Sequence, residues 1–184
     1  MERIIKKVSL EDYERTLDFV EKVFTDSESI EEGVLVRSLV NEIRSKKYYV
    51  KELDLMMVDE NDDIIGFAMF SRFHIDGKYE DELLLLSPVA VKTNLQRKHI
   101  SKDLLEYGID KAKKLGYSAI LVEGNPLNYR SRGFKTSADY KIYADETIHL
   151  PAIECLMILE LKEKALEHIS GFVNYGFYDT LNKS

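Results

Sequence analysis

The stretch LLLLSPVAVKTNLQRKHISKDLL, residues 83–105, decides which fold this chain adopts. Its first nine residues, LLLLSPVAV (83–91), form a nearly continuous apolar run, which is typical of a strand buried on both faces. The basic segment QRKHIS (96–101) follows, and a helix begins directly after it. A strand, a loop and a helix in this order leave backbone N–H groups free at the helix start, where an anion such as phosphate is favoured. The sequence therefore predicts an anion-binding loop at residues 96–101, although glycine is absent from it.

The residues after this loop predict a β-α-β unit. From Ser101 to Leu115 apolar residues fall on one helical face, and Gly116 is placed to end the helix. The run YSAILVEG (117–124) then predicts a strand that is parallel to the one at 83–91. Pro88 cannot donate a backbone hydrogen bond, so we expect a local break in the earlier strand, which would leave backbone groups free to bind a ligand.

The N-terminal third predicts a strand, two helices and a hairpin. ERIIKKVSL (2–10) is β-prone, Ser9 is placed to cap a helix running to residue 24, and IEEGVLVRSLVNEIRS (30–45) predicts a second helix. Two apolar runs flank the polar turn DENDD (59–63), and Gly66 in the second run indicates a bulge or close packing. We thus expect one mixed α/β domain over residues 1–184, with the order β-α-α-β-β-β-α-β-α-β-β and a splayed fourth strand. The tail from Lys162 onward has no assigned structure.

Composition narrows the class of protein. Of the 184 residues, 45% are apolar and 32% are charged, which is ordinary for a globular chain with a sizeable core. The formal net charge of −7 argues against broad nucleic-acid binding. No apolar stretch is long enough to span a membrane, and the only cysteine, Cys155, fits a reducing compartment, so we expect a cytoplasmic protein. The four histidines lack metal-ligand spacing, so we expect no metal site.

Three segments resemble the GNAT superfamily of acetyl-CoA-dependent N-acetyltransferases of bacterial type. MMVDENDDIIGFAMFS (56–71) is similar to the family's second and third strands. The segment from residue 86 to residue 124 is similar to its cofactor-binding core, and NPLNYRSRGF (125–134) resembles its closing Tyr-x-x-x-Gly-Phe segment. The resemblance implies an enzyme that takes acetyl-CoA as cosubstrate and transfers its acetyl group to a primary amine by direct attack.

The family's pyrophosphate loop reads Gln/Arg-x-x-Gly-x-Gly/Ala. Gln96 matches this pattern, whereas His99 and Ser101 stand at the two glycine positions. His99 either donates to a phosphate or obstructs the loop. The resemblance also implies that the strand before the loop pairs with the pantetheine arm and that one of its N–H groups polarises the acetyl carbonyl. The cofactor-binding residues that it implies are Val89, Ala90, Val91, Gln96, Arg97, Lys98, His99, Ile100, Ser101, Lys102 and Asn125.

Catalysis would involve a proton donor and a base. Tyr129, four residues before Gly133, matches the family's general acid, which protonates the leaving thiolate. An ammonium acceptor must lose a proton before it attacks, and the candidate bases are Glu82 and Glu123. A surface or ion-pair role is an open alternative for both glutamates, as helix capping is for Asn125.

Two further interpretations stay open. The chain is alternatively a non-catalytic acyl-CoA-binding or protein-interaction module, which the missing loop glycines favour and the retained Gln96 and Tyr129 oppose. A vestigial site that binds no cofactor is the third possibility. The acceptor, either a small molecule or a peptide amine, cannot be derived from the sequence, and a homodimer is compatible with it.

Overall fold

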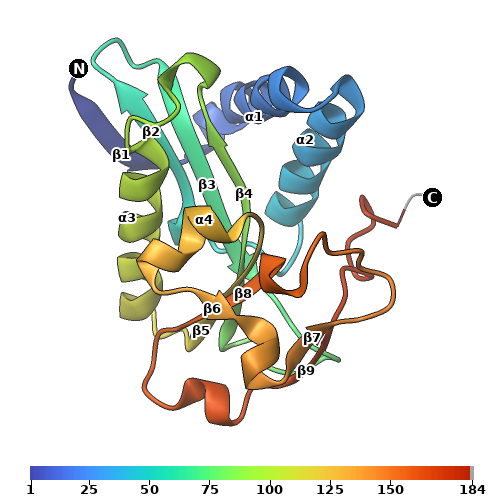
Figure 1. The fold of residues 1–184 in the computed structure, drawn as a ribbon. Coiled ribbons are helices and arrows are strands. Elements are labelled where there is room, and N and C mark those ends of the chain that lie inside the picture. The colour runs from blue at the N-terminus through green and yellow to red at the C-terminus, as the bar shows by residue number, and fades with distance from the viewer. Residues whose placement is uncertain (183–184) are drawn as a thin grey trace. The chain divides into compact units, whose positions relative to one another are not determined.

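The computed structural model describes residues 1–182 and contains the predicted order of elements (Figure 1). The seven strands of the main sheet are hydrogen-bonded in the order β1-β2-β3-β4-β5-β8-β6, and most neighbours are antiparallel. This mixed α/β architecture confirms the predicted fold class. The helices and strands are β1 (Arg3–Lys7), α1 (Tyr13–Ser27), α2 (Ile30–Arg44), β2 (Asp54–Asp59), β3 (Ile64–Arg72), β4 (Leu83–Val91), α3 (Ile100–Lys114), β5 (Ala119–Glu123), α4 (Pro126–Tyr129), β6 (Lys135–Thr136), β7 (Ile142–Ala144), β8 (Leu156–Glu160) and β9 (Gly171–Val173).

The chain folds into two compact units. Unit 1 comprises residues 1–71, 87–111 and the segment from Gly176 onward, and unit 2 comprises residues 72–86 and 112–175. The boundary falls inside β4, so this strand contributes to both units. That the whole chain acts as a single domain stays a prediction.

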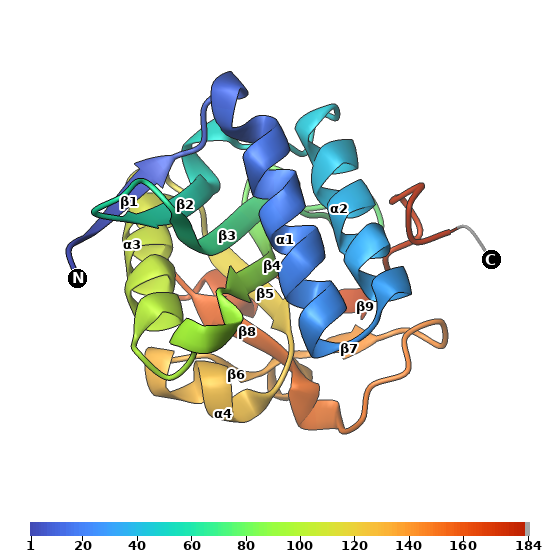
Figure 2. The same ribbon diagram turned by 90° about the horizontal axis from the view of Figure 1, so that it is seen from above.

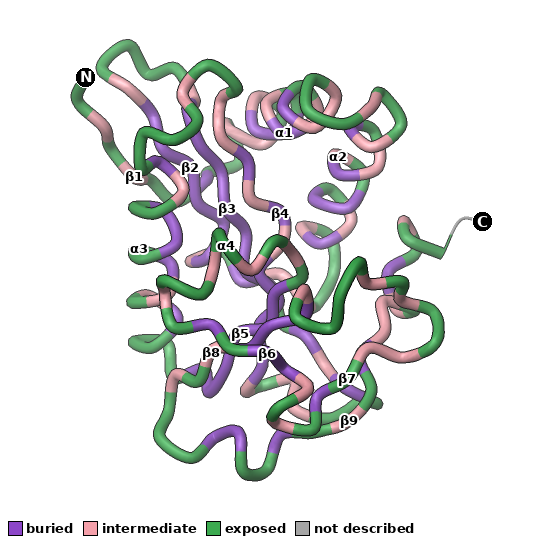
Figure 3. Tube along the Cα trace, viewed as in Figure 1, coloured by how far each residue is buried: buried purple, intermediate pink, exposed green. Residues whose placement is uncertain are grey.

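In unit 1, helices cover both faces of the hairpin formed by β2 and β3. Figures 1 and 2 show α3 on one face and the pair α1 and α2 on the other, and Figure 3 shows that both strands are buried. Met57 pairs with Gly66 and Val58 with Ile64, so the register shifts by one residue between Gly66 and Ile64. A Cβ atom at Gly66 would lie 2.6 Å from Ile100 Cγ2 on α3. Both predictions for Gly66, a bulge and close packing, are confirmed.

A buried ion pair ties α2 to β2. Arg44 Nε donates to Asp54 Oδ2 over 2.8 Å, and the exposed fractions of the two side chains are 2% and 0%. Tyr49 donates to the same carboxylate oxygen over 2.8 Å. Burial raises the pKa of the Asp54 carboxyl, and the hydrogen bonds from Arg44 and Tyr49 oppose that shift. Removal of either charge would therefore leave its partner uncompensated inside the protein.

The start of α1 differs from the expected boundary. Ser9 is the N-cap residue of a helical turn, and the Asp12 side chain accepts from its N–H and its hydroxyl through Oδ2, over 3.1 and 2.7 Å. That turn is a short 3-10 helix, Leu10–Asp12, and α1 begins only at Tyr13. The difference is small because helix ends commonly tighten into 3-10 geometry.

In unit 2, β5 runs parallel to the first part of β4 and antiparallel to β8. Leu83–Leu85 pair with Ala119–Leu121, and β5 pairs with β8 over its full length, Ala119–Glu123. The parallel pairing of β4 and β5 confirms the predicted β-α-β unit. The turn at the end of its helix is also as expected, since Gly116 has φ 91°, a left-handed conformation that glycine adopts without strain.

The C-terminal quarter contains structure that the sequence did not predict. In unit 2, β7 and β9 form a separate parallel two-stranded sheet, in which Ile142 pairs with Gly171. In unit 1, the segment from Gly176 packs against α2, where Thr180 N–H donates to Glu42 Oε1 over 2.7 Å. Tyr178 in this segment is fully buried. Within the described residues the tail is thus divided: residues 162–175 belong to unit 2, and residues 176–182 belong to unit 1, where Tyr178 is part of the core.

Candidate functional site

The loop before α3 adopts a glycine-type backbone although it contains no glycine. Arg97 has φ 63° and His99 has φ 64°, so both residues are left-handed. L-residues rarely adopt this conformation, because Cβ approaches the neighbouring carbonyl oxygen. His99 occupies the first glycine position of the family pattern. The backbone at that position thus has the positive φ that favours glycine, although the residue there is histidine.

The helix that follows begins immediately at the loop. The hydrogen bond from Asp103 N–H to His99 O, 3.0 Å long, is the first of the α3 ladder. The N–H groups of Ile100, Ser101 and Lys102 therefore precede the ladder and lie at the positive end of a helix of 15 residues. Ile100 is buried and anchors the helix start. This arrangement supplies backbone donors and a favourable dipole for an anion.

Exposed polar side chains, three of them positively charged, surround the same helix start. Gln96, Arg97, Lys98, His99 and Lys102 are all exposed. Lys102 lies 4.0 Å from Glu106 one turn later, a surface pair that adds little stability. The predicted loop residues are thus adjacent to one another and accessible to solvent.

The second half of β4 presents alternating side chains ahead of this loop. Val89 and Val91 are half-buried, whereas Ala90 between them is buried. Lys92 N–H donates to Ile65 O on β3 over 3.0 Å and fixes the end of the strand. The three predicted strand residues therefore lead directly into the loop.

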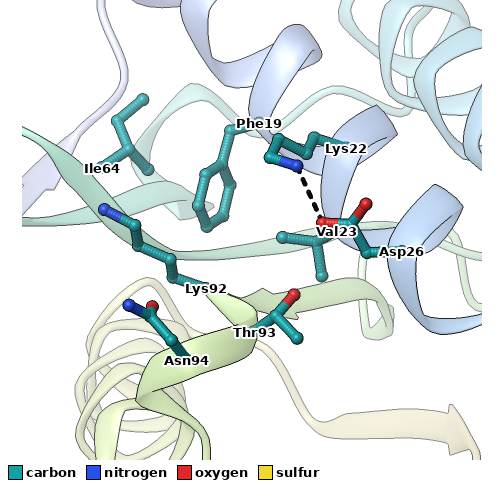
Figure 4. A pocket seen from close by; sticks show the side chains of 8 residues that line it. All are labelled: Phe19, Lys22, Val23, Asp26, Ile64, Lys92, Thr93 and Asn94. Carbon is teal, nitrogen blue, oxygen red and sulfur yellow. Dashed lines mark hydrogen bonds and ion pairs between the residues drawn. The ribbon is translucent and has the colours of Figure 1, made fainter.

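A groove lies beside the end of β4 in unit 1. Its volume is about 270 Å³, and Figure 4 shows side chains from α1 on one side and Lys92, Thr93 and Asn94 on the other. Phe19 and Ile64 form apolar walls. The ammonium group of Lys22 is paired with Asp26 over 2.9 Å at the rim. The groove combines an apolar interior with a polar margin.

Unit 2 carries the predicted proton donor on the short helix α4. Asn125 caps this helix, since its side chain accepts from Leu127 N–H over 3.0 Å. The Tyr129 ring packs edge-on against Phe134, with ring centroids 5.6 Å apart. A Cβ atom at Gly124 would lie 2.8 Å from Tyr129 Cε2, so glycine at this position makes room for the ring. Sequence reasoning had not singled out Gly124.

The environment of Tyr129 further favours the protonated form of its hydroxyl. Burial raises the pKa of the phenol, and the nearby Arg132 charge opposes this shift only in part. The neutral phenol is therefore the form present at physiological pH. A neutral phenol can donate a proton, whereas a phenolate cannot.

Both predicted bases, which lie in unit 2, have polar partners. His168 Nε2 lies 2.8 Å from Glu82 Oε1, and Ser118 Oγ donates to the same oxygen over 3.2 Å. Tyr175 donates to Glu123 Oε2 over 2.6 Å. Each glutamate has one carboxylate oxygen engaged in these contacts. A structural role thus exists for both, and catalysis by either remains a prediction.

One contact of the loop was not foreseen. Arg3 on β1 donates from Nη1 to the carbonyl oxygen of Lys98 over 2.7 Å. The two residues are 95 positions apart, and no local pattern connects them. Sequence reasoning offered no signal for this contact beyond the positive charge of Arg3 on a predicted strand.

Two features are absent from residues 1–182, a cluster of potential metal ligands and a helix of membrane-spanning length. Within that range no group of three or more His, Cys, Asp or Glu side chains could hold a metal ion. The same residues include no helix that is long and apolar enough to cross a membrane.

Comparison with known proteins places the chain in a family. The profile of the Acetyltransferase (GNAT) family matches residues 17–140, well over half of the chain. The uncharacterized N-acetyltransferase YhbS of Escherichia coli K12 is 25% identical over 138 residues, which cover 74% of this chain and 78% of that protein.

Solved structures show the same fold. YhbS from Escherichia coli, in complex with CoA, has a TM-score of 0.84 and 21% identity, covering 100% of this chain and 93% of that one. A GNAT acetyltransferase from Brucella melitensis, in complex with acetyl-CoA, has a TM-score of 0.66 and 22% identity, covering 88% and 89%. The fold and the profile match together establish that this chain belongs to the GNAT family of acetyltransferases.

Proposed function

We propose that this protein transfers the acetyl group of acetyl-CoA to a primary amine of an acceptor molecule by direct attack. The observation that carries the proposal is the left-handed backbone at Arg97 and His99, which joins β4 to the start of α3. The conformation normally supplied by glycine exists here without it. We infer that a pyrophosphate would find backbone donors in this loop, as it does in a glycine-containing one.

In this proposal the cosubstrate is held by residues of unit 1. The N–H groups of His99, Ile100 and Ser101 and the charges of Arg97 and Lys102 would hold the pyrophosphate. Backbone groups of β4 between Val89 and Val91 would pair with the pantetheine arm as an added strand does. When bound, acetyl-CoA supplies an activated thioester. A β4 N–H group would then stabilise negative charge on the acetyl oxygen.

In this proposal Tyr129 serves the leaving group. Attack of the neutral amine forms the new C–N bond, and the C–S bond then breaks. The phenol of Tyr129 gives its proton to the departing sulfur, and the phenolate regains a proton from the acylated nitrogen, which has one in excess. At neutral pH Tyr129 carries its proton, as an ordinary tyrosine does, and burial raises its pKa further, so the proton is present for transfer to the thiolate. Asn125 would contribute mainly by capping the helix that carries Tyr129.

The acceptor must reach the thioester as a free amine. We propose Glu82 or Glu123, directly or through a water molecule, as the group that takes the ammonium proton. Their hydrogen-bonded neighbours, His168 for Glu82 and Tyr175 for Glu123, would orient the carboxylate. The variants Glu82→Gln and Glu123→Gln distinguish the two candidates. Replacement of the residue that acts as the base should lower turnover with little change in acetyl-CoA affinity.

We propose the groove beside α1 as the region that contacts the acceptor. Its apolar walls at Phe19 and Ile64, with Lys92 beside them, suit an amine that also carries an apolar group and an anionic group. Phe19→Ala should raise KM for such an amine several-fold while KM for acetyl-CoA stays within twofold. Phe24→Ala, on the same helix and outside the groove lining, is the matched control. Equal effects of both variants would exclude the groove as an acceptor site.

The function is tested by thiol release. Purified protein is incubated with acetyl-CoA and a panel of amines, from amino acids to peptides, and free CoA is measured with a thiol reagent. Amine-dependent release supports the enzyme. Acetyl-CoA binding without release from any amine would favour the second candidate, a non-catalytic acyl-CoA-binding module, which the absence of loop glycines favours.

A further inference from the structure

The backbone of the loop is held from outside by one side chain. Arg3 Nη1 donates to Lys98 O over 2.7 Å and lies 3.9 Å from Asp103 Oδ2 in the first turn of α3. The Arg3 side chain is 25% exposed, so it is largely enclosed. A hydrogen bond from a charged donor is stronger than one between neutral groups. The guanidinium thus joins β1 both to the loop and to the helix that follows.

The Lys98 carbonyl that accepts from Arg3 belongs to a peptide group in the middle of the loop. Lys98 lies between the two left-handed residues, Arg97 and His99. In a planar trans peptide, the carbonyl of one residue and the N–H of the next point in opposite directions. A Lys98 carbonyl fixed toward Arg3 therefore fixes the His99 N–H pointing away from Arg3. That N–H is one of the donors assigned to the pyrophosphate.

This contact offers a physical reason why the loop keeps its shape without glycine. Left-handed conformations of L-residues persist only when surrounding contacts determine them. Arg3 supplies such a contact at the peptide between the two left-handed positions. Glycine would need no such support, since it adopts the conformation freely.

We propose that Arg3 is a positioning residue that presets the loop for the pyrophosphate of acetyl-CoA. The inference rests on the proposed function and adds a residue outside the family's loop pattern. Arg3 acts through the Lys98 carbonyl rather than by contact with the ligand. Its effect should therefore appear only with ligands that carry the pyrophosphate.

The test compares Arg3→Ala with Lys6→Ala by calorimetric titration of CoA. Lys6 is the matched control, because it is also a cation on β1 with a carboxylate partner, Asp62 at 2.8 Å. Arg3→Ala should raise Kd for CoA about tenfold, the scale of a lost charged hydrogen bond. Lys6→Ala should change Kd less than twofold, and Arg3→Lys should recover part of the loss.

A second readout separates positioning from general structural damage. S-acetylpantetheine lacks the pyrophosphate. With this thioester, the amine-dependent rate of Arg3→Ala should equal that of the wild-type protein. With acetyl-CoA its KM should rise while kcat is retained. Equal losses with both thioesters would overturn the inference, and so would an unchanged Kd for CoA in Arg3→Ala. If the unmodified protein bound no CoA, the proposed function would fail and the inference with it.

Discussion

Replacement of His99 by glycine separates the backbone of the loop from its side chain. His99 is exposed and has φ 64°, so glycine would relieve a conformational cost of about 1–2 kcal/mol. Glycine also loses more chain entropy on folding, about 0.5–1 kcal/mol. The free energy of unfolding should therefore rise by between zero and about 1.5 kcal/mol. For a chain of this length that corresponds to at most about 6 °C in Tm.

The same variant should bind CoA almost normally. The donors proposed for the pyrophosphate are N–H groups, and His99→Gly retains all of them, so Kd for CoA in a calorimetric titration should stay within about threefold. His99→Pro is the contrasting variant, because proline lacks the N–H and has φ fixed near −65°. It should weaken binding by about tenfold or more. A tenfold loss in His99→Gly would refute the reasoning and assign the anion contact to the imidazole.

Three further outcomes are expected. Tyr129→Phe should lower kcat by about 10²-fold or more, while Kd for acetyl-CoA stays within twofold. Tyr143→Phe is the control, because Tyr143 is an exposed tyrosine of the same unit, and it should leave kcat and Kd unchanged. Similar kcat values for the two variants would show that Tyr129 does not transfer the proton. The pKa of Tyr129 is raised in the folded state, so loss of its proton should lower kcat only above the ordinary tyrosine pKa near 10. The free energy of unfolding should likewise begin to fall through titration of Tyr129 only above that pH. Arg44→Leu should lower the free energy of unfolding by about 3–5 kcal/mol, or Tm by roughly 6–20 °C, because it leaves the Asp54 carboxylate buried without its cation. Arg37→Leu loses only partly exposed ion pairs and should cost less than about 1 kcal/mol. Comparable costs of the two variants in denaturant titrations would contradict this prediction.

Much of the fold could be predicted because the decisive signals are local. The hairpin around residues 59–63 follows from two apolar runs and a polar turn, and its bulge follows from Gly66. The helix α3 follows from apolar spacing and from Gly116 at its end. Each signal lies within one continuous segment, so it can be read without knowledge of contacts between distant residues.

The missed elements depend on pairing between distant residues. β7 and β9 have three residues each, and Ile142 pairs with Gly171 nearly thirty positions later. Runs of this length are too short to show the alternation of apolar and polar residues that predicts a strand. The burial of Tyr178 depends on a surface provided by α2 and its neighbours, which cannot be seen from the tail itself.

The candidate site was predictable in composition but not in conformation. The residue order identifies Gln96 and Tyr129 through the family pattern, whereas the left-handed φ of His99 is set by its surroundings. The Arg3 contact with Lys98 illustrates this, because the two residues approach each other only after β1 and α3 have packed. The absence of glycine from a loop is therefore a weak argument against its function.

Thermal unfolding with and without acetyl-CoA tests directly whether the loop of residues 96–101 binds the cosubstrate. At about 100 times its Kd, a ligand stabilises the folded state by about 2.7 kcal/mol, which for a chain of this length raises Tm by roughly 5–10 °C. We expect such a rise, with a smaller one for S-acetylpantetheine at the same concentration. An unchanged Tm at millimolar acetyl-CoA would contradict the account, because it would mean that the loop of residues 96–101 does not hold a pyrophosphate.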